Sequence, residues 1–220
     1  MNYLSHYVYN HDICGQPQRP VFALGVALPD LWPRFSRRRR LRWRAVRAAV
    51  TADGDAAELR AGLLNHVAVD QRFHGLASFL TWQRALKATP GAGDVHSMTL
   101  DFMTHVALEL ALDQRLLRAE PALADRFYDT LAGADPLRVV ADVSRVGDVD
   151  ACGLEDTISL FVARRFLRRY ATDEGLAHAF GLALSVIPAT ALPAEGLARE
   201  ILRRAATLAD PDVIWREMSR

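Results

Sequence analysis

The stretch HSMTLDFMTHVALELALDQRLLR (residues 96–118) decides how this chain folds, because its polar and apolar residues recur with the period of an α-helix. Within it Asp101, His105 and Glu109 recur at every fourth position, and Asp113 extends the row. Positions four apart lie on one face of a helix, about 6 Å apart. The residues around this row are apolar, namely Val106, Ala107, Leu108, Leu110 and Leu112. The pattern predicts the longest helix of the chain, with a polar row where a core is expected.

A second stretch, LLNHVAVDQRFH (residues 63–74), places His66, Asp70 and His74 in the same register among Leu, Val and Phe. Burying imidazoles and carboxylates is costly unless something compensates their polarity. A metal ion does so, because both side-chain types are metal ligands. Both rows can also be explained without a metal, as pairs on a helix surface or as a hydrogen-bond network. Asp101 can also be an acidic residue in the first helical turn, where the helix dipole favours it.

Helical periodicity dominates the rest of the chain as well, and the alternation typical of β-strands is scarce. We therefore expect an all-α protein: a single multi-helix bundle of about eight to ten helices in one domain, residues 1–220. Within it, residues 1–118 form the half with the expected metal site, and residues 119–220 form the C-terminal helices. The predicted helices cover residues 2–9, 36–50, 56–73, 76–87, 96–118, 122–132, 136–146, 154–171, 174–187, 195–208 and 211–218. An apolar segment, 21–32, is expected to end at Pro29 and Pro33.

The composition is that of a globular protein: of 220 residues, 50% are hydrophobic and 24% are charged, with a net charge of +1. No signal peptide and no apolar run long enough to span a membrane is present, so a cytoplasmic location is expected. Cys14 and Cys152 are too few for a disulfide framework and are expected to be buried free thiols. The sequence contains no GxGxxG, phosphate-binding loop, GxSxG, HExxH or CxxC motif.

Histidines and carboxylates in the first half of the chain form the candidate site. The candidate metal ligands are His6, Asp30, His66, Asp70, His74 and His105, and the candidate catalytic residues are Asp101 and Glu109, which could orient water. These donors suit Mn²⁺, Fe²⁺, Zn²⁺ or Mg²⁺ without choosing among them. Such a cation can activate water at neutral pH and stabilise charge on a phosphoryl oxygen. Taken alone, His6 could also be a buried histidine with a purely structural hydrogen bond. Asp30 could simply end the apolar segment after Pro29.

Eight arginines lie between Arg34 and Arg47, in a segment read as a basic amphipathic helix. The candidate residues for binding a substrate or partner are Arg37, Arg38, Arg39 and Arg40. A dense basic face attracts an anionic partner, whereas arginines that only solvate a surface helix would show the same pattern. Because the net charge is only +1, nucleic acid is not expected as the partner.

Four short segments resemble the family of bacterial acyl carrier protein phosphodiesterases, in the order in which that family has them. They are the start MNYLSH, the segment GVALPD from Gly25 to Asp30, the segment HVAVD from His66 to Asp70, and TLDFM from Thr99 to Met103. The resemblance covers the first half of the chain. Val67 and Ala68 stand where the family tends to have basic residues, and His105 stands where it tends to have Asp, so a divergent branch is expected.

This resemblance implies an all-helical fold distantly related to the HD-domain metal phosphohydrolases, with a divalent metal, typically manganese. The family hydrolyses the phosphodiester that joins 4′-phosphopantetheine to a serine of acyl carrier protein. On that basis His6, Asp30, His66 and Asp70 would be site residues, with Asp101 nearby.

Three hypotheses follow. The first is a metal-dependent phosphodiesterase whose substrate is acyl carrier protein, with the arginines holding the acidic partner. The second is a non-enzymatic binding or scaffold protein whose polar rows are hydrogen-bond networks and whose arginine-rich helix is a docking surface. The third keeps the metal site but takes a nucleotide or a phospholipid as substrate. The sequence does not indicate the oligomeric state.

Overall fold

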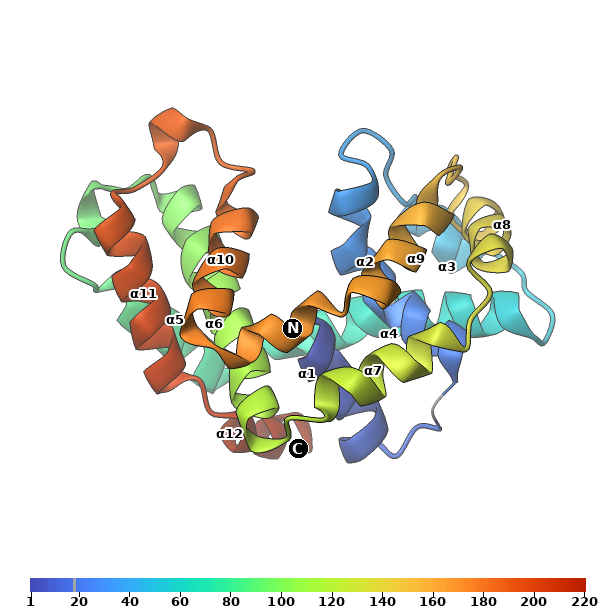
Figure 1. Cartoon of the computed structure of the whole chain (residues 1–220), viewed down its shortest axis with the longest axis horizontal. Coiled ribbons are helices and arrows are strands. Elements are labelled where there is room, and N and C mark those ends of the chain that lie inside the picture. The colour runs from blue at the N-terminus through green and yellow to red at the C-terminus, as the bar shows by residue number, and fades with distance from the viewer. Residues whose placement is uncertain (18) are drawn as a thin grey trace. The chain divides into compact units, whose positions relative to one another are not determined.

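The chain is all-α in the computed structural model, which describes residues 1–17 and 19–220, and these residues contain no β-strand (Figure 1). The α-helices are α1 (Tyr3–Val8), α2 (Pro20–Phe35), α3 (Trp43–Ala48), α4 (Asp55–His74), α5 (Ala77–Lys87), α6 (Ser97–Ala119), α7 (Leu123–Ala132), α8 (Pro136–Gly147), α9 (Leu154–Arg164), α10 (Asp173–Leu184), α11 (Glu195–Leu208) and α12 (Pro211–Met218). A π-helical turn, Tyr9–Ile13, continues α1, and a 3₁₀ turn, Phe166–Ala171, follows α9. Among the described helices, none combines the length and the hydrophobicity needed to span a bilayer.

The helices form two compact units, each built from segments that lie far apart in the sequence. Unit 1 consists of residues 1–5, 71–123 and 167–220, and unit 2 consists of residues 6–70 and 124–166. Each unit combines residues from before and after position 118, so the units do not follow the halves expected from the sequence. The expectation of a single domain stays a prediction.

In unit 1, the long helix α6 packs against α5, α10 and α11, and these four helices lie side by side in Figure 1. The short helix α12 packs against α5 and α6. Helix α6 has buried residues on more than one side, such as Met103, Leu108 and Leu112. This burial explains why its sequence is apolar on both sides of the polar row.

In unit 2, helices α2 and α4 touch backbone to backbone. A Cβ atom added at Gly62 would lie 2.3 Å from the carbonyl oxygen of Phe22, and one added at Gly25 would lie 2.6 Å from that of Leu59. Only glycine fits at both positions, so the two glycines allow an approach that larger residues would prevent. Helix α9 packs against α2 and α8, and α3 packs against α8.

The expected end of the apolar segment at Pro29 and Pro33 is wrong, because α2 runs through both prolines to Phe35. Each internal proline removes a backbone hydrogen bond and costs about 3 kcal/mol in an isolated helix. Ten residues of α2 are buried, from Val21 to Trp32, and this packing offsets the loss.

The expected basic helix over residues 36–50 is also wrong, because only Trp43–Ala48 is helical. The hydroxyl of Ser36 accepts hydrogen bonds from the backbone N–H groups of Arg38 and Arg39, at 3.3 and 3.0 Å. These bonds close a local turn after α2, and the like charges of the consecutive arginines disfavour a helix there. The arginine segment, residues 37–40, is therefore an exposed non-helical connection between α2 and α3.

Two smaller expectations also fail. Helix α9 ends at Arg164, because Arg165 adopts a left-handed conformation with φ of 45° and the chain continues as a 3₁₀ turn. Both cysteines are free, as expected, but Cys14 and Cys152 are exposed rather than buried.

Candidate metal centre

Four of the six predicted ligands come together inside unit 2. His6 comes from α1, and His66 and Asp70 come from α4; one ligand atom from each lies within 4.8 Å of the others. Asp30 comes from α2, and its Oδ1 lies 3.9 Å from Nε2 of His66. We call these residues, His6, Asp30, His66 and Asp70, the first ligand group.

The glycine contact between α2 and α4 fixes the orientation of His66. Because Gly25 and Gly62 let the two backbones meet, the carbonyl of Val26 comes within 2.9 Å of Nδ1 of His66. A carbonyl oxygen can only accept, so Nδ1 donates and carries the proton of the neutral ring. The other nitrogen, Nε2, then presents a lone pair.

His66 is neutral at physiological pH. Burial, with a smaller contribution from His6, lowers the pKa of His66 to about 3, whereas Asp70 acts in the opposite direction. The ring of His6 stacks on that of His66, with 4.5 Å between the centroids. With its single proton on Nδ1, His66 has no proton on the side that faces the carboxylates.

The carboxylate of Asp70 contacts both imidazoles through their Nε2 atoms. Its Oδ1 is 3.1 Å from Nε2 of His6, and its Oδ2 is 3.4 Å from Nε2 of His66. Nε2 of His66, which carries the lone pair, therefore lies near oxygens of two carboxyl groups, at 3.4 Å from Asp70 and 3.9 Å from Asp30. A divalent cation among these atoms would accept all the lone pairs, and two imidazoles with two carboxylates suit Mn²⁺, Fe²⁺ or Zn²⁺. The donor set thus fits the cation expected from the sequence.

A second ligand group lies inside unit 1 and consists of His74, His105 and Glu109. Nε2 of His74 is 3.1 Å, and Nε2 of His105 is 3.0 Å, from the same oxygen, Oε1 of Glu109. The α-ammonium of Met1 lies 2.8 Å from this oxygen as well. The spacing of four residues between His105 and Glu109 places both on one face of α6, whereas His74 is the last residue of α4.

Glu109 is ionised despite its burial. Burial raises the pKa of a carboxyl group, but the ammonium of Met1 and the two imidazoles outweigh it and hold the pKa of Glu109 well below its usual range. The negative charge of Glu109 is thus neutralised by groups of the chain itself.

The predicted catalytic residue Asp101 lies outside both groups. It pairs with Lys87 of α5, and its side chain is 55% exposed. Asp113, which extends the polar row, accepts hydrogen bonds from the backbone of Leu4 and from the backbone and hydroxyl of Ser5, at 2.6–3.2 Å. Asp101 therefore forms a surface ion pair with Lys87, and Asp113 anchors α1 on α6.

The four arginines of the arginine segment are all exposed, but they differ in their contacts. Arg39 is held by the carboxylate of Asp150 at 3.3 Å and by the carbonyl oxygens of Asp150 and Cys152. Within residues 1–17 and 19–220, no carboxylate pairs with Arg37, Arg38 or Arg40. Three of the four arginines thus remain available to an anionic partner.

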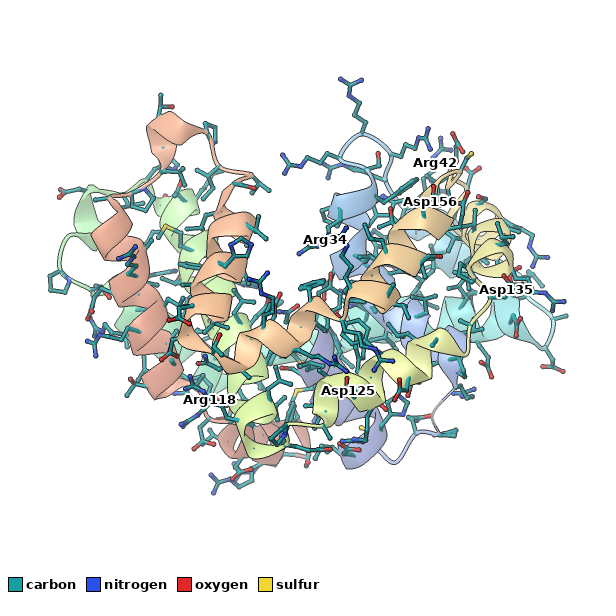
Figure 2. The ribbon with its side chains drawn as sticks, viewed as in Figure 1. Arg34, Arg42, Arg118, Asp125, Asp135 and Asp156 are labelled. Atoms are coloured by element: carbon teal, nitrogen blue, oxygen red, sulfur yellow. The ribbon has the colours of Figure 1, made fainter. Side chains whose placement is uncertain are left out.

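The sequence prediction missed two features of α2, the helix that carries Asp30. One is the backbone carbonyl of Val26, which no side-chain pattern reveals, although the glycines at 25 and 62 signal a close helix contact. The other is Arg34, which lies four residues after Asp30 on α2 and so on the same helix face. Its guanidinium lies over the ring of Phe166, 4.5 Å from the centroid, and Figure 2 labels it.

Comparison of the chain with protein-family models, with curated proteins and with solved structures finds no match.

Proposed function

We propose that the chain is a metal-dependent phosphodiesterase whose cation is bound by His6, Asp30, His66 and Asp70. The observation that carries this proposal is the orientation of His66. Its Nδ1–H is fixed on Val26, so its Nε2 lone pair faces two carboxylates, an arrangement that a cation would stabilise. The resemblance to acyl carrier protein phosphodiesterases involves the same four residues and supports the reaction type. We also propose that its fold is distantly related to that of the HD-domain phosphohydrolases.

Bound by the first ligand group, a divalent cation would lower the pKa of a water molecule and neutralise charge on a phosphoryl oxygen. The oxygen of Asp30 that does not bind the cation would accept the proton of the attacking water as the new P–O bond forms. The ester P–O bond then breaks, and the released alcohol takes up a proton from solvent. Arg34, one helix turn from Asp30, can donate two hydrogen bonds to the phosphate oxygens.

The substrate that the resemblance suggests is holo acyl carrier protein, from which 4′-phosphopantetheine would be released. The arginine segment supports a large acidic substrate, because Arg37, Arg38 and Arg40 are exposed and begin two residues after α2, the helix that carries Asp30. Exposed positive charges of this kind can steer an acidic protein toward the site.

Hydrolysis of bis-p-nitrophenyl phosphate tests the reaction type. The wild-type chain, stripped of metal and supplied with Mn²⁺, is expected to release p-nitrophenol, and His66→Ala is expected to lower the rate at least about 100-fold. The matched control is His178→Ala, which removes an exposed histidine of α10. Equal rates for the wild type and His66→Ala would refute the proposal.

Mass spectrometry of the products tests the substrate. Incubation with holo acyl carrier protein is expected to reduce the mass of that protein by one phosphopantetheine group. Activity on nucleotides or phospholipid headgroups, with none on the carrier protein, would keep the metal site but replace the substrate. Binding of the carrier protein without any hydrolysis would instead favour the non-enzymatic docking protein, for which the exposed arginine segment is the supporting observation.

A further inference from the structure

The second ligand group brings three ligand atoms as close together as the ligands of one metal ion. Two imidazole nitrogens approach one carboxylate oxygen, Oε1 of Glu109, at 3.0 and 3.1 Å, and one ligand atom from each residue lies within 4.8 Å of the others. Bonds of about 2.0–2.2 Å from a metal to nitrogen and oxygen place neighbouring ligand atoms about 3.0–3.4 Å apart. The N···O separations therefore match the edge of a coordination polyhedron.

The surroundings hold the two imidazoles in place and leave one side open. Phe79 of α5 packs against both rings, with centroid distances of 5.3 Å to His74 and 5.6 Å to His105, and Phe73 packs against His74 at 5.2 Å. Phe73 and Phe79 are fully buried, whereas the side chains of His74 and His105 are 31% and 32% exposed. A site with rigid ligands on an apolar wall and access to solvent can exchange a metal ion and keep coordination positions for water.

We infer that His74, His105 and Glu109 bind a divalent transition-metal ion of their own, in addition to the ion of the first ligand group. The two groups share no residue, and each lies wholly within one of the two compact units. Their donors also differ: the second group offers two imidazoles and one carboxylate, whereas the first offers two of each. Imidazole-rich sites favour Zn²⁺, and added carboxylates favour Mn²⁺, so the second group is the one expected to prefer Zn²⁺.

The ammonium of Met1 competes with such an ion only in part. It contacts Oε1 of Glu109 at 2.8 Å, but a carboxylate has two oxygens and about four lone-pair sites. The competing explanation is a purely structural cluster in which the ammonium and both imidazoles donate to Glu109. That explanation predicts no metal binding at this group, so metal binding decides between the two.

Metal stoichiometry of the purified full-length chain tests the inference. Protein freed of metal by chelator and dialysis is titrated with Co²⁺, whose visible absorption reports its coordination, and bound metal is measured by elemental analysis. The variants are His105→Ala and His105→Gln for the second group and His66→Ala for the first group. The control is again His178→Ala, and circular dichroism at 222 nm establishes that each variant is folded.

The wild type and His178→Ala are expected to bind two Co²⁺ ions, and each of the other variants is expected to bind one. The ion retained by His66→Ala should be displaced by Zn²⁺ but not by equimolar Mn²⁺. Wild-type binding of one ion or none would overturn the inference, and so would two ions in folded His105→Gln. Loss of both ions from His105→Gln would show a single shared site and also overturn it. Because His66→Ala separately tests the first ligand group, failure of this inference is distinguishable from failure of the proposed phosphodiesterase.

Discussion

Replacing Asp70 with Asn is expected to change the stability of the protein in opposite directions with and without metal. In the metal-free protein one oxygen of Asp70 faces Nε2 of His6 at 3.1 Å and the other faces the lone pair of His66 at 3.4 Å. An asparagine amide can accept from His6 with its oxygen and donate to His66 with its nitrogen. The substitution thus places a hydrogen-bond donor opposite the lone pair of His66 and removes a carboxylate metal ligand.

The expected magnitudes follow from these contacts. A new hydrogen bond contributes about 1 kcal/mol, which for a chain of this length raises the melting temperature by about 2–4 °C. Metal at about 1,000 times its Kd stabilises the wild type by about 4 kcal/mol, or about 8–16 °C, whereas Asp70→Asn should gain little from metal. Metal-free Asp70→Asn should therefore melt above the metal-free wild type, and with metal the order should reverse.

Thermal unfolding followed by circular dichroism, in EDTA and in excess Mn²⁺, measures both differences. Asp156→Asn is the matched control, because Asp156 is an exposed carboxylate of α9 in the same unit (Figure 2). The reasoning would be refuted if metal-free Asp70→Asn melted several degrees below the wild type. It would also be refuted if Mn²⁺ raised the melting temperatures of both proteins equally.

Three further changes should have measurable effects. Gly62→Ala should cost about 3 kcal/mol in urea unfolding, because its Cβ would lie 2.3 Å from a carbonyl oxygen of α2, whereas Gly181→Ala meets no atom within 4 Å and should not destabilise the fold. Burial raises the pKa of Asp113 to about 6, above its ordinary 3.8, so the folded chain binds this proton more tightly than the unfolded chain. The stability gained from this proton is present below about pH 4 and is lost as the pH rises through 6. The loss in unfolding free energy is about 3 kcal/mol. Urea unfolding at several pH values measures it, and the loss should be smaller in Asp113→Asn. Reversing the charges of Arg38 and Arg40 should raise KM for the carrier protein about tenfold or more at low salt with little change in kcat, and an unchanged KM would argue against the docking role.

The parts of the candidate site that could be predicted from the sequence are those that depend on helix geometry alone. His66 with Asp70, and His105 with Glu109, are four residues apart, and a helix brings such pairs together wherever it lies in the fold. The division of the ligands into two groups was not predictable, because it depends on how α1 and α2 pack. The shared use of one Glu109 oxygen is likewise a result of tertiary packing.

The failures of the sequence prediction also have physical causes. The prolines of α2 have a strong local preference against a helix interior, but the burial of ten residues outweighs it. Residues 36–50 have the spacing of an amphipathic helix, but consecutive arginines repel one another, and the Ser36 hydroxyl accepts hydrogen bonds from the backbone of Arg38 and Arg39 in a local turn. In both cases a tertiary or side-chain contact outweighed the local pattern.

The most direct test is the anomalous diffraction signal of crystals grown with Mn²⁺ and collected at the manganese absorption edge. The expected result is a peak about 2.2 Å from Nε2 of His6, from Nε2 of His66 and from an oxygen of Asp70. Manganese-containing crystals in which no peak lies within bonding distance of Nε2 of His66 would contradict a metal centre in the first ligand group.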